Sequence, residues 1–276
     1  LEKAPAPLLK AACAGADGAY ASEAAKEMLP GAELLFRPDF GAAFASLENG
    51  ECDCAVVPIE NSLAGSVTEI YDLMFKHRFF IRESLSLPIS HSLLGIKGAR
   101  ADEINTVISH PQALAQCSEF ISGNKLNKIA AENTALAAKS AAEKGDVTLA
   151  AIASKKAGKL YGLEALTENI QNDKDNFTRF LCIVKELYVP TDANRFSLTF
   201  ALEHETGSLY RVLSRFAAAG INLTKLESRP MRGRSFEYQF YLDCEGSIRT
   251  EKNLDLLCAL SEELPEFRFL GNYAIC

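Results

Sequence analysis

The order in which two kinds of segment follow one another is the sequence feature that most limits how this chain can fold. Through the first two thirds of the chain, short apolar runs alternate with stretches in which apolar residues recur at helical spacing. Such alternation of strands and helices predicts a mostly parallel sheet with helices on both of its faces. We expect strands at residues 8–14, 33–37, 55–59, 106–109, 128–131, 147–153 and 177–185, and helices at residues 20–29, 39–48, 66–75, 111–121, 134–143 and 155–161.

Four residues mark the ends of expected helices. Asp39 and Ser154 are N-cap candidates, because short polar side chains accept hydrogen bonds from the free N–H groups of a first helical turn. Pro111 suits a first helical position, where its missing N–H costs nothing, and Gly145 suits a C-cap. These residues predict where four of the helices begin or end.

An extended stretch at residues 83–94, which contains Pro88, interrupts the alternation. It indicates a crossing between two α/β halves, and residues 177–185 are the expected return crossing. Two halves joined by two crossings enclose a cleft. Ligands of such sheets bind beyond the carboxyl ends of the strands, so we expect a binding site there.

The pattern changes after a polar linker at residues 188–194, which contains Pro190. The order becomes strand, helix, strand, strand, helix, strand, which is typical of a ferredoxin-like unit. We expect its strands at residues 196–202, 223–227, 236–242 and 267–273, and its helices at residues 208–219 and 253–264.

Charge and hydropathy argue against two classes of partner. The net charge is -7 and no basic cluster occurs, which argues against a nucleic acid partner. No uninterrupted apolar run reaches the length of a membrane span, so we expect no membrane insertion. The start of the chain lacks the charged-then-apolar layout of a signal peptide, so we expect a cytoplasmic protein.

The eight cysteines predict buried thiols in a reducing compartment. Most lie inside apolar runs, as Cys13 and Cys182 do. Cys52 and Cys54 are two residues apart, which is the wrong spacing for a zinc knuckle, and no second pair lies near them. We therefore expect no metal site.

The first polar motif runs from Pro58 to Ser66, between an expected buried strand and a helix. Glu60, Asn61 and Ser62 belong to it. A turn of this kind presents amide and hydroxyl groups, with free backbone N–H groups, to an anion. The alternative is that Ser62 or Ser66 merely caps the helix.

Two further motifs lie at strand ends. In the segment 109–114, His110 could act as a general base and Gln112 as a neutral clamp, or both could be ordinary turn and surface residues. In the segment 176–180, Thr178 could present a hydroxyl to the cleft and Arg179 could bind a carboxylate in bidentate fashion. The alternative is an edge strand with a solvated Arg179.

Together with the segment 15–20, these motifs resemble the prephenate dehydratase family in order and spacing. The resemblance covers essentially the whole chain and rests on the segments VVPIENSLAGSV, SHPQALAQC, AAIAS with the following YGL, and NFTRF. The segments 207–210 and 227–230 look like the two phenylalanine-binding motifs of an ACT domain, which uses the strand and helix order predicted above. We expect a two-lobed, periplasmic-binding-protein-like α/β catalytic domain at residues 1–187 and a ferredoxin-like α+β ACT domain at residues 194–276.

The resemblance implies that prephenate loses carbon dioxide and water to give phenylpyruvate in phenylalanine biosynthesis. Aromatisation drives this reaction, so the resemblance implies no nucleophile, metal or cofactor. It implies that Thr178 donates a proton to the leaving hydroxyl, that Asn61, Ser62 and Gln112 orient the substrate, and that Arg179 binds or balances a carboxylate. Glu60 belongs to the same expected catalytic set.

The resemblance also implies feedback inhibition by phenylalanine at an interface between subunits of a dimer or tetramer. The expected effector site consists of Gly207, Ser208, Leu209, Asn222, Leu223, Glu227, Ser228 and Arg229.

The sequence departs from the family pattern at Ala14 and Ala21, where the family often carries polar groups. Two other functions remain open. One is arogenate dehydration, in which an amine replaces the keto group of the substrate side chain, and the other is a non-catalytic amino-acid sensor. The family also occurs fused behind a helical chorismate mutase domain. We expect no such domain in this chain, since few residues precede the first strand.

Overall fold

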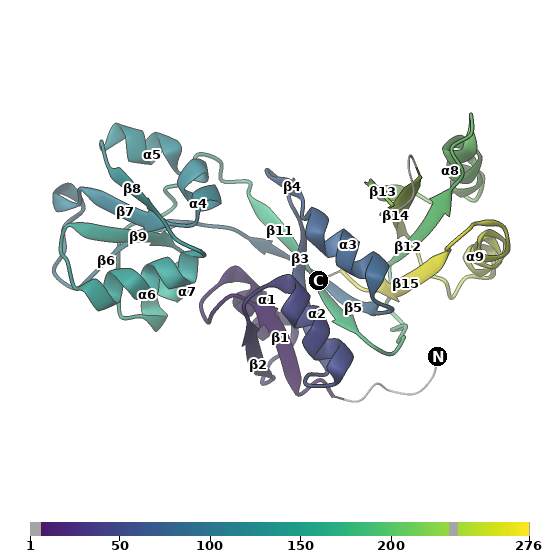
Figure 1. The fold of residues 1–276 in the computed structure, drawn as a ribbon, viewed down its shortest axis with the longest axis horizontal. Coiled ribbons are helices and arrows are strands. Elements are labelled where there is room, and N and C mark those ends of the chain that lie inside the picture. The colour runs from purple at the N-terminus through teal and green to yellow at the C-terminus, as the bar shows by residue number, and fades with distance from the viewer. Residues whose placement is uncertain (1–6, 232–236, 276) are drawn as a thin grey trace.

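The structure, a computed structural model, describes residues 7–231 and 237–275, which form two α/β lobes and a smaller α+β domain (Figure 1). Phe236, with which one strand was expected to begin, lies outside the described residues. The predicted fold class is confirmed: two lobes joined by two crossings, followed by a ferredoxin-like domain.

The first lobe is a sheet with the strand order β2-β1-β3-β11-β5, in which β4 also pairs with β3. One core, around α1, fills one face of the sheet, and a second core, around α2 and α3, fills the other. The elements are β1 (Lys10–Ala14), α1 (Tyr20–Met28), β2 (Glu33–Arg37), α2 (Phe40–Asn49), β3 (Cys54–Asn61), β4 (Gly65–Ser66), α3 (Thr68–Lys76), β5 (Phe80–Pro88) and β11 (Phe177–Val184).

The second lobe is a sheet with the strand order β10-β6-β9-β7-β8, covered by α4 and α5 on one side and by α6 and α7 on the other. The elements are β6 (Ser92–Gly95), the short 3₁₀ helix η1 (Ala101–Glu103), β7 (Thr106–Ser109), α4 (Pro111–Gln116), α5 (Ser118–Gly123), β8 (Asn127–Ala130), α6 (Thr134–Lys144), β9 (Leu149–Ala153), α7 (Lys155–Leu160) and β10 (Glu164–Thr167).

The two lobes are joined by the β5–β6 and β10–β11 connections. The expectation of mostly parallel sheets is only partly met. The β1–β2, β1–β3, β7–β8 and β7–β9 pairs are parallel, but β11 pairs antiparallel with both β3 and β5. The physical reason is the return crossing: a chain that leaves a lobe along one strand comes back along its neighbour in the opposite direction.

The expected helix ends are largely confirmed. Asp39 Oδ1 accepts a hydrogen bond from the Ala42 N–H, Ser154 Oγ accepts one from the Ala157 N–H, and Gly145 ends α6 in the left-handed conformation. The helix expected at residues 111–121 is divided at Cys117 into α4 and α5. The strand β10 was not anticipated.

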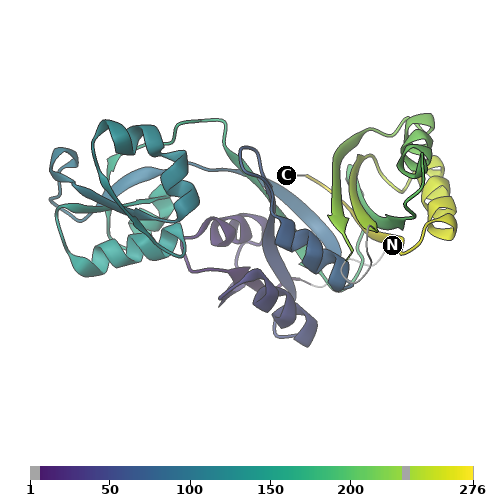
Figure 2. The same cartoon turned by 45° about the horizontal axis from the view of Figure 1, so that its top comes forward.

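The C-terminal domain has the strand order β13-β14-β12-β15, the ferredoxin-like arrangement. Its helices α8 and α9 cover the outer face of the sheet (Figure 2). The other face packs on the first lobe, where Tyr241, Leu270 and Tyr273 join the core that contains Ile59 and Tyr71. The elements are β12 (Arg195–Leu202), α8 (Ser208–Ala218), β13 (Leu223–Pro230), β14 (Tyr238–Glu245), α9 (Glu251–Glu263) and β15 (Arg268–Tyr273).

A glycine allows a close approach between the first lobe and the C-terminal domain. Gly271 of β15 has φ of +145°, and a Cβ atom built on it would lie 2.3 Å from the carbonyl oxygen of Ile81 in β5. We expect Gly271→Ala to lower the free energy of unfolding by about 2 kcal/mol or more, because the obstacle is backbone that cannot move aside cheaply. Chemical denaturation measures this. Gly123→Ala is the control, since a Cβ there meets nothing within 4 Å. Equal stability of the two variants would contradict the predicted close packing.

Candidate active site

A cavity of about 410 Å³ is lined by both lobes. Ala14 ends β1 and Asn61 ends β3, while His110 follows β7 and Asn133 follows β8. The cavity therefore lies at the carboxyl ends of the parallel strands, as predicted for this class of sheet. Among the expected catalytic residues, Asn61, Gln112 and Thr178 line it, together with Tyr20, His91 and Gln116.

Asn61 and Thr178 form the polar centre of this cavity. They lie opposite each other in the ladder between β3 and β11, and Asn61 Nδ2 donates a hydrogen bond to Thr178 Oγ1 at 3.0 Å. The same amide nitrogen also lies 2.7 Å from Asn176 Oδ1 and 3.1 Å from the Phe177 carbonyl oxygen, and Asn61 Oδ1 accepts hydrogen bonds from the Leu63 and Ala64 N–H groups. Because the amide supplies the hydrogen of the Asn61–Thr178 bond, the Thr178 hydroxyl keeps its own hydrogen for another acceptor.

The lining holds no fixed cation: of the described residues that line the cavity, none is Lys or Arg. The N-termini of α1, α2 and α6 also reach the cavity, because their first residues or N-caps line it, and those of α2 and α6 are capped by the Asp39 and Asn133 side chains. Within the described chain, no side chain caps α1, so its first N–H groups are open to a ligand. Because residue 21 is Ala, this wall lacks a polar side chain there, but the backbone N–H donors of α1 remain.

His110 and Gln112 stand at the start of α4. The Gln112 N–H donates to His110 Nδ1 at 3.2 Å, so the imidazole serves as the N-cap of this helix. Burial lowers the pKa of His110 below its ordinary value, which keeps the ring neutral near pH 7. The geometry therefore gives His110 a structural contact in addition to its place on the cavity wall.

His91 is a cavity residue that sequence reasoning missed. Its side chain is buried, its Nε2 lies 2.9 Å from Gln116 Oε1, and its Nδ1 lies 3.3 Å from the Tyr20 hydroxyl. Tyr20 donates to the Ser90 carbonyl at 2.6 Å, so one group of contacts ties α1, the first crossing and α4 together. In the sequence His91 lies within the extended stretch at residues 83–94, which predicts a crossing between the lobes but does not by itself indicate a cavity residue.

Ser62, Glu60 and Arg179 are not among the residues that line the cavity. Ser62 Oγ donates to the Asp175 carbonyl and accepts from the Phe177 N–H, so it fastens the return crossing to β3. Arg179 contacts carboxylates of the protein itself, those of Glu60 and Asp243. The helix-capping alternative for Ser62 and Ser66 is not seen either, because the N-cap of α3 is Val67.

The cysteines of the described chain are free thiols. Burial raises the pKa of Cys13 to about 12 and that of Cys52 to about 11, which suppresses thiolate formation near neutral pH. In residues 7–231 and 237–275, no group of three His, Cys, Asp or Glu side chains is arranged to hold a metal ion.

The residues expected to bind phenylalanine are divided between the two faces of the C-terminal sheet. Ser208 and Leu209 line a cavity of about 130 Å³ with Phe240, and Phe240 lies opposite Ser228 in the β13–β14 ladder. Gly207, with φ of +82°, is the N-cap of α8. The remaining members lie elsewhere: Glu227 accepts a hydrogen bond from Ser66 Oγ, Arg229 pairs with Asp72, Asn222 binds Glu245, and Leu223 packs against the domain core.

Comparison with known proteins identifies the family. The sequence pattern of the prephenate dehydratase family matches residues 11–187, more than half of the chain. A chloroplastic arogenate dehydratase/prephenate dehydratase of Arabidopsis thaliana is 39% identical over 94% of this chain and 70% of its own length. Arogenate dehydratase 1 of Petunia hybrida is 39% identical over 98% of this chain and 68% of its own. The chain therefore belongs to the prephenate dehydratase family, a group of lyases of phenylalanine biosynthesis.

Solved structures agree with this assignment. A prephenate dehydratase from Arthrobacter aurescens in complex with L-Phe superposes with a TM-score of 0.87 at 29% identity, over 96% of this chain and 90% of that one. GqqA, described as a novel type of quorum quenching acylase, superposes with a TM-score of 0.88 at 31% identity, over 97% of this chain and 98% of that one. The fold is thus shared by proteins to which different reactions are ascribed.

No helix in the described part of the chain has the length and apolar character needed to cross a membrane.

The Asn61–Thr178 hydrogen bond can be tested by an almost isosteric change. Asn61→Asp keeps the oxygen that accepts from the Leu63 and Ala64 N–H groups but replaces the donor to Thr178, and to its neighbours Asn176 and Phe177, by an acceptor. The Thr178 hydroxyl would then turn its hydrogen to the new carboxylate. We expect turnover of the natural substrate to fall roughly 10²-fold with little change in KM, the size of a lost proton-donating contact. Steady-state kinetics and circular dichroism measure this, and a folded variant with normal kcat contradicts it.

Burial of His91 predicts a pH dependence of stability. Desolvation lowers the pKa of His91 in the folded protein, although its hydrogen bond with Gln116 opposes the shift. As the pH falls below about 6.5, the unfolded chain takes up a proton that the folded protein resists, so the free energy of unfolding falls with pH. We expect His91→Gln to lose this part of the slope, which is at most about 1.4 kcal/mol per pH unit. Denaturation between pH 7.5 and 5 measures it. The exposed His204→Gln is the control, and parallel curves for wild type and His91→Gln contradict the prediction.

Proposed function

We propose that this protein catalyses the decarboxylating dehydration of prephenate to phenylpyruvate. The observation that carries the proposal is the Asn61–Thr178 hydrogen bond at the wall of a cavity whose described lining has no Lys or Arg. Membership of the prephenate dehydratase family supports it.

The chemistry requires two bonds to break in the substrate. The ring carboxylate leaves as carbon dioxide, its electron pair enters the ring, and the ring hydroxyl leaves with a proton as water. Thr178 is positioned to supply a hydrogen bond, or to relay a proton, to that hydroxyl, because Asn61 occupies one of its lone pairs and leaves its hydrogen free. A threonine hydroxyl is a weak acid, so the net proton comes from solvent through this group.

The lack of cations in the described lining suits this reaction. A Lys or Arg paired with the ring carboxylate would stabilise the substrate more than the transition state, since negative charge leaves that group as the bond breaks. Backbone N–H groups at the N-termini of α1, α2 and α6 can orient carboxylates by weaker contacts. Gln112 and Gln116 add neutral hydrogen-bonding groups to the same wall.

Arogenate is the second candidate substrate. Asp39, Glu69 and Glu132 line the cavity and could pair with the ammonium group that distinguishes arogenate from prephenate. The plant relatives that are 37–39% identical to this chain carry the name arogenate dehydratase, alone or with prephenate dehydratase. The reaction at Thr178 would be the same, and only the contacts with the substrate side chain would differ.

The similarity to GqqA raises acyl transfer as a different reaction. The described lining offers the hydroxyls of Tyr20, Thr134 and Thr178, but no Ser or Cys. The side-chain partner of Thr178 is the amide of Asn61, which cannot accept a proton as a general base would. This arrangement favours dehydration over nucleophilic attack on an acyl group.

We further propose that phenylalanine inhibits the enzyme through the C-terminal domain, which would then be an ACT domain. The solved prephenate dehydratase in complex with L-Phe supports this effector. The small cavity beside Ser208 and Leu209, close to Ser228 across the sheet, is one wall of the proposed site. Among the described strands, β13 lies at the edge of its sheet and could pair with a second copy, in keeping with a dimer or tetramer. We expect the enzyme to work in a reducing compartment such as the cytoplasm, because its described cysteines are free.

One set of assays tests the proposed function. Purified protein is given prephenate, arogenate and an N-acyl amide, and product is measured for each, with and without phenylalanine. We expect turnover of prephenate or arogenate, inhibition by phenylalanine, and a loss of roughly 10²-fold or more in Thr178→Ala. Thr167→Ala is the control, because this strand threonine does not line the cavity. Cleavage of the amide alone, or normal dehydration by a folded Thr178→Ala, would overturn the proposal. Binding of phenylalanine without any turnover would favour the sensor.

A further inference from the structure

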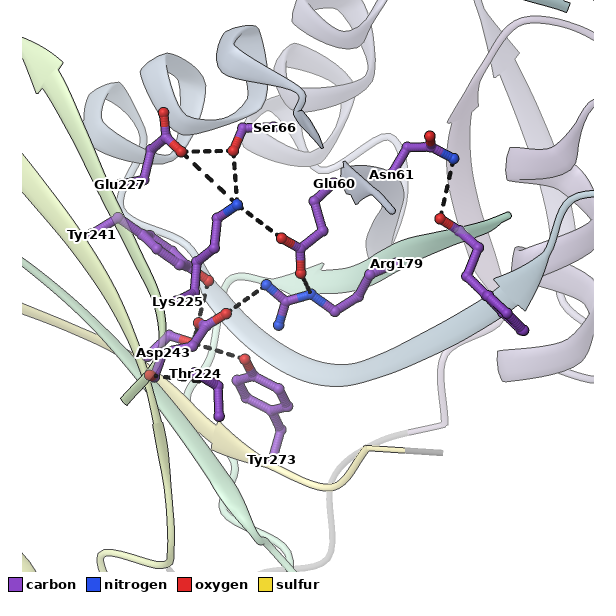
Figure 3. Close-up of polar contacts among 12 residues, drawn as sticks. Glu60, Asn61, Ser66, Arg179, Thr224, Lys225, Glu227, Tyr241, Asp243 and Tyr273 are labelled. Atoms are coloured by element: carbon purple, nitrogen blue, oxygen red, sulfur yellow. Dashed lines mark hydrogen bonds and ion pairs between the residues drawn. The ribbon is translucent and has the colours of Figure 1, made fainter. Parts of the chain in front are cut away.

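The strands β3 and β11 present two neighbouring residue pairs to two different surroundings. Thr178 lies opposite Asn61, and Arg179 lies opposite Glu60 one residue further on. Successive side chains of a strand point to opposite faces of the sheet. The first pair therefore faces the cavity between the lobes. The second pair faces the C-terminal domain, where Figure 3 shows Glu60 and Arg179 beside Lys225 and Asp243.

Arg179 is held by carboxylates from both domains. It is 6% exposed, its Nε lies 2.8 Å from Glu60 Oε1, and its Nη2 donates to Asp243 Oδ2 at 2.5 Å. Burial alone would lower the pKa of this guanidinium, but Asp243 above all, with Tyr241, Tyr273 and Glu60, outweighs that effect and raises it. Arg179 is therefore charged and fixed in place, directly beside Thr178 in the chain.

Asp243 is the more deeply buried of the two carboxylate partners of Arg179. Its side chain is 0% exposed, and its second oxygen accepts a hydrogen bond from Ser197 Oγ at 2.5 Å. Ser197 is fixed in turn by a hydrogen bond with the Tyr273 hydroxyl at 2.7 Å. A buried carboxylate without its cation is strongly unfavourable, so Arg179 is required to stay where the C-terminal sheet holds Asp243.

Lys225 connects Glu60 to the edge strand of the same sheet. Its Nζ lies 2.8 Å from Glu60 Oε2 and donates to Ser66 Oγ at 2.8 Å, while Ser66 Oγ donates to Glu227 at 2.6 Å (Figure 3). Lys225 and Glu227 belong to β13, the strand that also carries Ser228 of the proposed effector site. These contacts link β13 to Glu60, the residue before Asn61.

We propose that Asp243 and Lys225 are positioning residues for the active site, which act on Thr178 through the Glu60–Arg179 pair. The C-terminal domain thus completes the geometry of the catalytic domain even without an effector. Movement of β13 on effector binding would change turnover by the same path. This inference rests on the proposed dehydratase function for its kinetic tests.

The first experiment compares two contacts of the same domain interface. Asp243→Asn removes the charge that holds Arg179, and Arg268→Gln removes hydrogen bonds to the Met74, Phe75 and His77 carbonyls on α3 and just beyond its end, away from β3 and β11. We expect Asp243→Asn to lower kcat about tenfold with KM changed less than about twofold, and Arg268→Gln to leave both within about twofold. Circular dichroism confirms folding. A folded Asp243→Asn with normal kcat, or an equal loss in Arg268→Gln, overturns the proposal.

Lys225→Met decides the question if Asp243→Asn does not fold, because Lys225 is less deeply buried. We expect a smaller fall in kcat, about threefold, and inhibition by phenylalanine that needs at least about fivefold more effector, while calorimetry shows that phenylalanine still binds. Unchanged turnover together with an unchanged inhibition curve overturns the proposal.

A readout that needs no substrate separates this inference from the proposed function. The side-chain amide of Asn61 is expected to shift its NMR resonance in Asp243→Asn and in Lys225→Met but not in Arg268→Gln. Wild-type protein that turns over neither prephenate nor arogenate refutes the function, whereas the resonance test still applies. An Asn61 resonance unmoved in the folded variants refutes the positioning role, even in an active dehydratase.

Discussion

The antiparallel ladder between β3 and β11 is the pairing on which the site, the lobes and the C-terminal domain all depend. β3 is a buried strand of the first lobe, and β11 is the strand that returns from the second lobe and lies between β3 and β5. Their register places Thr178 opposite Asn61. A slip by one residue would turn each side chain of β11 to the other face, putting Arg179 into the cavity and Thr178 against Asp243. Ser62, which binds the backbone at Asp175 and Phe177, lies at the end of the ladder where such a slip would begin.

The two faces of this ladder differ in the charge of the side chains that they present. On the cavity side the ladder presents an amide and a hydroxyl, and the lining supplies neutral groups, helix N-termini and a few carboxylates. On the other side lie Glu60, Arg179, Lys225 and Asp243, in contact with one another. A buried ion pair of this kind adds little net stability, because desolvation cancels much of the attraction, but its geometry is demanding. Its contribution here is to fix the position of Glu60 and Arg179 relative to the C-terminal domain. Thr178, the neighbour of Arg179 in β11, is the residue whose position then depends on it.

Local signals in the sequence predicted the elements better than their assembly. The caps at Asp39 and Ser154 and the glycine at Gly145 depend on contacts within a few residues, and they are found as expected. Asn61, Gln112 and Thr178 come together in the cavity because Asn61 ends β3, Gln112 follows β7, and Thr178 lies near the start of β11 opposite Asn61. Strand alternation also required that Thr178 and Arg179 point to opposite faces, but it could not say which face was the cavity.

Contacts between distant segments account for the features of the site and fold that the sequence did not predict. The place of Arg179 depends on Asp243, which is sixty-four residues away and lies one residue beyond the strand expected at residues 236–242. The contacts of His91 depend on Tyr20 and Gln116, which the crossing brings together from different lobes. The division of α4 from α5 at Cys117 likewise reflects tertiary packing, since Cys117 is buried in the core of the second lobe.

The first lobe and the C-terminal sheet share a hydrophobic core, which couples the position of the ion pairs to that of the C-terminal sheet. Tyr241 and Tyr273 pack with Tyr71 and Ile59 in one continuous cluster, and the Tyr71 and Tyr241 rings meet edge to face with centroids 4.9 Å apart. Close-packed interiors shift between discrete arrangements more readily than they stretch. If the C-terminal sheet moves, this cluster and the Glu60–Arg179 pair must therefore move together with it. The Asn61–Thr178 hydrogen bond, one residue away in the same two strands, is the part of the active site that such a movement reaches first.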